Sequence, residues 1–154
     1  MFAAPPVLAR AWLRVVGWLE ALQPLALLAA RLYVARAFFL SGLTKIRDWD
    51  TTLALFTDEY HVPLLPPELA AYAGTTGELL LPVLLALGLA GRFSAMGLFV
   101  LNIVAVLSLQ EVAEAALQQH IFWGSLLAGL ILWGPGKWSV DHFLGPRFLG
   151  AARS

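Results

Sequence analysis

The chain has 154 residues, of which 60% are hydrophobic and 13% are charged. Because soluble domains carry about 25% charged residues, this composition excludes an ordinary soluble domain and indicates a membrane protein. The ten basic and ten acidic residues cancel and no basic run is present, which argues against nucleic acid as a partner. The sequence contains no cysteine, so this chain by itself has no thiol chemistry and any redox role needs a partner or a bound cofactor.

The first predicted element is a helix over residues 7–22, within an N-terminal segment at 1–23. Arg10, Arg14 and Gly17 share one face of this helix, and large apolar residues occupy the other faces. The pattern is typical of an amphipathic helix that lies in the membrane interface. A cleaved signal peptide is the alternative, but the charges alternate with apolar residues and no distinct small-residue cleavage site follows.

Four later stretches are apolar over roughly the 20 residues that cross the hydrocarbon of a bilayer. They are Pro24 to Lys45, Leu69 to Leu89, Phe93 to Leu109 and Ile121 to Trp138. The fold predicted from them is all-α: an integral membrane four-helix bundle over 24–143, preceded by the interfacial helix and followed by a short cytoplasmic tail at 144–154.

The connections between these spans also carry predictions. In the longest one, 46–68, the sequence "LALF" predicts a short helix on the membrane surface. The sequence "VPLLPP" predicts extended backbone, since each proline disfavours helix for the residue before it. The sequence "QEVAEAALQQH" is helical in character and can extend the third or fourth span by a turn.

Basic residues are unevenly divided between the two sides of the predicted bundle. The larger group consists of Arg10, Arg14, Arg31, Arg92, Lys137, Arg147 and Arg153. On the other side, Lys45 and Arg47 lie among acidic residues. Cytoplasmic loops carry the excess of lysine and arginine, so both termini are predicted to be cytoplasmic.

Two formal charges, Arg36 and Glu78, fall well inside the predicted spans. Each lies nine residues from the outer end of its span, at Lys45 and Leu69 respectively, which places both roughly 13 Å deep. A lone charge at the bilayer centre costs at least about 2.5 kcal/mol, so charges inside membranes face protein or water and pair with one another. We therefore predict an ion pair between Arg36 and Glu78, with Asn102, Ser41 and Thr44 satisfying further hydrogen bonds.

Two roles are open for this pair. It can hold the bundle together without any chemistry, or it can face a cavity and bind a polar head group such as a quinone carbonyl. A proton relay through Glu78 is less favourable, because a carboxylate beside a guanidinium stays ionised.

His61 and His120, with acidic residues nearby in the sequence, are weak candidates for a metal site. No pair of histidines has the spacing of ligands on one helix, and solvated interfacial histidines are the alternative. Neither is deep enough in the predicted bundle to be a haem ligand. No catalytic signature is present, so the sequence leaves open whether the chain is an enzyme.

Three stretches together resemble the DoxX family of small bacterial membrane proteins: "RLYVARAFFLSGLTK", "AGTTGELLLPVLLALGLAGRFSA" and "GPGKWSVD". The likeness covers residues 26 to 143. It implies a four-helix bundle in the bacterial inner membrane with both ends cytoplasmic. It also implies an association with membrane redox chemistry, because relatives include a subunit of a thiosulfate:quinone oxidoreductase and proteins proposed to act in thiol and oxidative-stress systems.

By position, Arg31, Lys45 and Glu78 match polar positions of the family, whereas Arg36 stands where small or apolar residues are usual. The resemblance thus leaves Lys45 or a ligand as other partners of Glu78. Arg31 and Asp141 are expected to be structural: Arg31 extends toward the head groups, and Ser139 caps a short terminal helix with Asp141 in its first turn.

The leading hypothesis is an auxiliary or quinone-interacting subunit of a membrane oxidoreductase system. Its candidate ligand-binding residues are Arg36, Glu78, Lys45 and Asn102. The expected partners are the bilayer and other membrane or soluble redox subunits, and a homo-oligomer is a further alternative. The alternative functions are a binding or transport protein for a small solute or metal, and a purely structural membrane scaffold.

Overall fold

The computed structural model describes residues 7–109 and 111–144. Its helices are α1 (Val7–Arg47), α2 (Trp49–Asp58), α3 (Pro67–Leu87), α4 (Gly91–Ser108) and α5 (Glu114–Trp133). No strand occurs among the described residues. Four of these helices, α1, α3, α4 and α5, are long and apolar enough to cross a membrane. The predicted all-α four-helix membrane bundle is confirmed.

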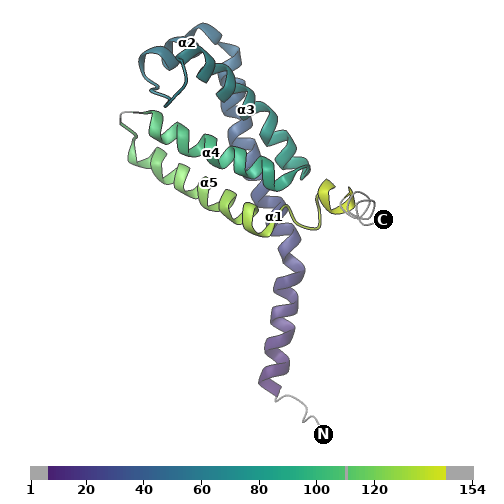
Figure 1. Cartoon of the computed structure of the whole chain (residues 1–154). Coiled ribbons are helices and arrows are strands. Elements are labelled where there is room, and N and C mark those ends of the chain that lie inside the picture. Colours follow the sequence, from purple (N-terminus) through teal and green to yellow (C-terminus); the bar gives the residue numbers. More distant parts are fainter. Residues whose placement is uncertain (1–6, 110, 145–154) are drawn as a thin grey trace.

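Helix α1 is much longer than a membrane span. Its 41 residues extend about 60 Å at 1.5 Å per residue, twice the roughly 30 Å of bilayer hydrocarbon. Only its second half packs in the bundle; the first half projects beyond it, opposite the end that carries α2 (Figure 1). The predicted helix at 7–22 is present, but α1 continues through Pro24, so this segment and the first span form one helix. Its location in the membrane interface stays a prediction.

The bundle core lies where α1, α3, α4 and α5 meet. Its buried members come from all four helices: Val34, Phe38, Leu85, Ala95, Leu98, Leu127 and Leu130. Many large apolar side chains on the outside are exposed, as expected where lipid rather than protein covers a surface. Small residues allow close approach: a Cβ added to Gly42 of α1 would lie 2.9 Å from the Leu79 side chain of α3.

Helix α2 covers the end of the bundle farthest from the N-terminus (Figure 1). Asp48 caps it, since its carboxylate accepts from the amide of Thr51 at 3.1 Å. Phe56 of α2 packs on Ala70 and Ala71 of α3, forming a second small core. The predicted short helix in the long connection is therefore confirmed, and its location on the membrane surface stays a prediction. The extended backbone predicted for "VPLLPP" is wrong in part, because the chain turns at 63–65, where Leu64 has a positive φ of 67°, and Pro67 begins α3.

At the opposite end the chain leaves α5 at Gly134, whose positive φ of 81° suits glycine. A short helix at 140–144 follows, and Ser139 caps it by accepting from the amide of His142 at 3.3 Å. The predicted cap is confirmed. The predicted tail at 144–154 lies outside the described residues except for Leu144.

Candidate functional site

An ion pair links α1 to α3 near the α2 end of the bundle. Lys45, in the last turn of α1, places Nζ 2.6 Å from Oε2 of Glu78 and 2.9 Å from Oγ of Ser41. The two charged side chains are mostly buried, with 20% and 13% of their surface exposed. Thr52 of α2 donates to the carbonyl of Lys45 at 2.9 Å, which fixes the turn between α1 and α2 beside the pair.

The predicted pair between Arg36 and Glu78 is wrong, because Arg36 is exposed on the outside of the bundle and Glu78 bonds to Lys45. Arg36 and Lys45 are nine residues apart, which at about 100° per residue puts them on opposite faces of α1. The depth match also fails. Glu78 packs at the level of Gly42, because a Cβ added to Gly42 would lie 3.1 Å from the Cβ of Glu78. Gly42 is six residues from Arg36 along α1, so Arg36 lies at a different depth from Glu78.

The side chains expected to assist Arg36 have other partners. Asn102 is buried between α4 and α5, where its Nδ2 donates to the carbonyl of His120 at 3.0 Å. Ser41 accepts from Lys45, and Thr44 donates to the carbonyl of Leu40 at 3.0 Å within α1. The polar residues of the spans therefore form two separate centres, one at Lys45 and Glu78 and one at Asn102 and His120.

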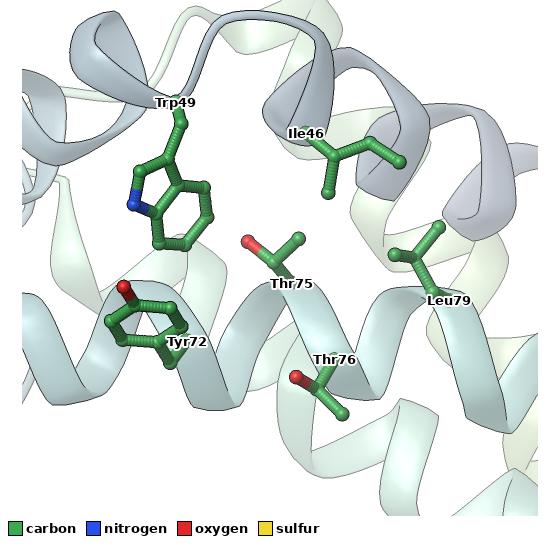
Figure 2. A pocket seen from close by; sticks show the side chains of 6 residues that line it. All are labelled: Ile46, Trp49, Tyr72, Thr75, Thr76 and Leu79. Atoms are coloured by element: carbon green, nitrogen blue, oxygen red, sulfur yellow. The ribbon is translucent and has the colours of Figure 1, made fainter.

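A pocket of about 390 Å³ adjoins the first centre (Figure 2). Its lining residues come from α3, α2 and the end of α1: Tyr72, Thr75, Thr76, Leu79, Trp49 and Ile46. The rings of Trp49 and Tyr72 lie with their centroids 4.7 Å apart at 43°. Ile46 and Leu79 directly follow Lys45 and Glu78 in the sequence, so the pocket and the ion pair share the same turns of α1 and α3.

Thr75 supplies an unsatisfied polar group at this pocket. The residue is 4% exposed, and its Oγ1 has no hydrogen-bond partner within 7–109 and 111–144. Buried hydroxyls in proteins nearly always have a partner, and one that lacks it costs about 1–3 kcal/mol. A ligand that enters the pocket and reaches the hydroxyl of Thr75 would supply the missing partner.

Sequence reasoning missed this pocket. The detectable signal was the spacing of Tyr72, Thr75, Thr76 and Leu79, which recur at i, i+3, i+4 and i+7 on one face of a helix. The placement of Trp49 opposite that face depends on the turn between α1 and α2, which the sequence does not specify.

Tyr60 follows α2 and packs edge-on against Phe56, with ring centroids 5.0 Å apart. Burial raises the pKa of the Tyr60 phenol, and the carboxylates of Glu59 and Glu78 raise it further. The phenol therefore stays protonated at neutral pH and is a hydrogen-bond donor close to the ion pair.

The two histidines proposed as weak metal candidates lie in different settings. His61 is exposed, with Nδ1 3.2 Å from the carbonyl of Glu59 and its amide bonded to the carbonyl of Ser108. His120 is part of the centre with Asn102. Across the described ranges, no three histidine or acidic side chains are grouped closely enough to hold a metal ion.

The opposite end of the bundle is built around Arg31, which is fully buried. Its Nη2 donates to the carbonyl of Trp138, so the expectation that this side chain extends to the head groups is wrong. Asp141 holds the same end together, since its carboxylate accepts from the amides of Ala90 and Gly91 at 2.8 and 2.7 Å at the start of α4. Arg31 therefore ties α1 to the segment after α5, and Asp141 ties that segment to the turn between α3 and α4.

These structural features coincide with a family match. Residues 26–111, which include the Lys45–Glu78 pair and the pocket beside it, match DoxX. The chain belongs to the DoxX family. It is also similar to an "uncharacterized protein" of Haemophilus influenzae, at 32% identity over 128 residues that cover 77% of this chain and 83% of that protein. No solved structure matches this DoxX protein.

Proposed function

We propose that this DoxX protein binds the head group of a membrane quinone in the pocket between α2 and α3, as an auxiliary subunit of a membrane redox system. The observation that carries the proposal is the buried hydroxyl of Thr75, which has no partner among the described residues and lies beside the paired rings of Trp49 and Tyr72. A quinone has a flat ring that can pack against aromatic side chains and carbonyl oxygens that can accept a hydrogen bond.

The size and polarity of the pocket support such a ligand. Its volume of about 390 Å³ lies within the roughly 300–1,000 Å³ of small-molecule sites, which combine an apolar lining with a few placed polar groups. Each polar group of the lining can donate a hydrogen bond: the hydroxyls of Thr75 and Tyr72, which can also accept, and the indole N–H of Trp49, which only donates. Lys45 directly precedes the lining residue Ile46, and its ammonium favours a hydrogen-bond acceptor nearby.

The auxiliary role follows from what this chain carries. The sequence has no cysteine, and a bound quinone exchanges electrons only with another redox group. A redox partner is therefore part of the proposal. Arg36 supports a partner within the membrane, since an exposed arginine in the middle of a span is costly unless it meets a carboxylate, carbonyl or phosphate.

The proposed location is the bacterial inner membrane with both termini cytoplasmic. Arg92 lies at the start of α4 and Lys137 after the end of α5, on the side away from α2, and Arg31 lies within α1 at the level of Trp138, to which it bonds. Acidic residues surround α2. The positive-inside rule then places α2 and the quinone pocket on the periplasmic side.

Direct binding tests the proposal. The protein is reconstituted in nanodiscs and titrated with decylubiquinone, and binding is followed by quenching of tryptophan fluorescence. The variant Thr75→Val keeps the side-chain shape and removes the hydroxyl, so we expect about tenfold weaker binding. Thr57→Val is the matched control, because Thr57 is exposed on α2 and bonds only to its own helix. Equal affinity of Thr75→Val and Thr57→Val contradicts the proposal.

A structural scaffold is the second candidate, favoured by the ion pair that ties α1 to α3. The variant Glu78→Gln separates the two functions. Assembly in the membrane with weakened quinone binding supports the ligand site. Failure to assemble, with normal quinone affinity in the fraction that folds, supports the scaffold.

A further inference from the structure

A second cavity, of about 440 Å³, lies between α4 and α5 and does not share a lining residue with the quinone pocket. Its lining is mostly apolar, and its polar side chains are Asn102, His120 and Ser125. Among the residues that the structure describes, no charged side chain lines it. A ligand of this cavity is therefore neutral and largely apolar.

Asn102 fixes the tautomer of His120. The amide nitrogen of Asn102 donates to the backbone carbonyl of His120 at 3.0 Å, which turns its oxygen Oδ1 toward Nδ1 of the ring at 2.8 Å. An amide oxygen only accepts, so Nδ1 carries the proton and, in the neutral ring, Nε2 presents a lone pair. The ring is held further by Trp123, which packs edge-on at 5.2 Å.

The lone pair of His120 is open to a ligand. Within the described part of the chain, Nε2 has no hydrogen-bond partner and is not fully enclosed. The hydroxyl of Ser125 donates to the carbonyl of Ile121 at 2.8 Å and does not compete for it. The cavity thus offers a ring nitrogen that only accepts, whereas the polar groups of the quinone pocket can donate.

We propose that the cavity between α4 and α5 binds a lipid-soluble phenol or hydroquinone, whose hydroxyl donates to Nε2 of His120. A phenol is a stronger hydrogen-bond donor than an aliphatic alcohol, and its apolar ring suits the lining, which includes Phe99. The reduced form of a quinone has the required hydroxyl and the oxidised form does not. This site does not depend on the proposed function, because it uses other helices and shares no lining residue with the quinone pocket.

The test compares two probes of nearly equal shape under anaerobic, reducing conditions. Trimethylhydroquinone has two hydroxyls, whereas its dimethyl ether has none. We expect wild-type protein in nanodiscs to bind the hydroquinone about tenfold more tightly than the ether, the effect of one hydrogen bond in an apolar site. Equal affinities overturn the proposal.

Histidine-specific ¹⁵N NMR identifies the residue involved. The Nε2 resonance of His120, assigned by its loss in His120→Gln, should shift on saturation with the hydroquinone and stay in place with the ether. An unchanged resonance at saturation overturns the assignment to His120. The variant His120→Leu should lose the preference between the probes, and Thr75→Val should keep it. If Thr75→Val loses the preference for the hydroquinone and His120→Leu keeps it, the hydroquinone binds in the quinone pocket and the second site is overturned.

Discussion

Replacing Lys45 by methionine tests the ion pair between α1 and α3 most directly. The variant keeps the length of the side chain and leaves the carboxylate of Glu78, which is 13% exposed, without its cation. For unit charges 2.6 Å apart, an effective dielectric constant of about 20 gives an attraction of about 6 kcal/mol. Desolvation of both ions offsets part of this attraction, so we expect Lys45→Met to lower the free energy of unfolding by about 3 kcal/mol.

A double-mutant cycle isolates the pair from other effects. The variant Lys45→Met/Glu78→Met removes both charges and should recover most of the loss, because apolar replacement of a buried ion pair is often close to neutral. Unfolding in mixed micelles of a mild detergent and sodium dodecyl sulfate, followed by circular dichroism, measures Lys45→Met, Glu78→Met and the double variant. Arg36→Met is the control and should not lower stability, since Arg36 is exposed on an apolar surface. A coupling energy below about 0.5 kcal/mol, or an equal loss in Arg36→Met, refutes this account.

Three further predictions use the same unfolding assay or fluorescence. Gly88→Ala should lower the free energy of unfolding by at least about 3 kcal/mol, because φ is +67° and the new Cβ would clash with the buried guanidinium of Arg31. Gly17 has open space around it, so Gly17→Ala should leave the free energy of unfolding unchanged or raise it. Asp141→Ala should cost about 2 kcal/mol, because two amides at the start of α4 lose their acceptor, and a loss near zero would contradict this. Hydrogen bonds from Thr51 lower the pKa of Asp48 below its ordinary value of 3.8. The cap therefore stabilises α2 fully at a pH above 3.8, and this stabilisation is lost as the pH falls through the lowered pKa of the folded protein. Tryptophan fluorescence should show α2 loosening below about pH 4 in wild type but not in Asp48→Asn, and identical profiles would refute it.

Composition and apolar runs were sufficient for the architecture. Spans of about 20 apolar residues must be helical in a bilayer, because lipid offers no partner to backbone N–H and C=O groups. The same local logic located α2 between its flanking turns and Ser139 at the start of the last short helix. These features depend on neighbouring residues along the chain, which the sequence lists directly.

The face of α1 on which each charged residue lies could also be inferred from the sequence, but from the helical periodicity of the apolar residues and not from depth along the helix. Arg31, Val34, Phe38 and Gly42 are buried on one face of α1, and Lys45 continues that face at helical spacing. Depth along the helix suggested Arg36 as the partner of Glu78. The face of the helix excludes it.

The sequence by itself determined that this protein spans a membrane with four helices and carries a few polar groups inside them. Only the tertiary structure decided which groups meet, because helix rotation and the relative height of α1 and α3 follow from packing between segments far apart in the chain. That packing placed Glu78 against Lys45, Trp49 over Thr75, and Asn102 on His120. Contacts between helices depend on side chains of both partners at once, and no single stretch of sequence contains that information.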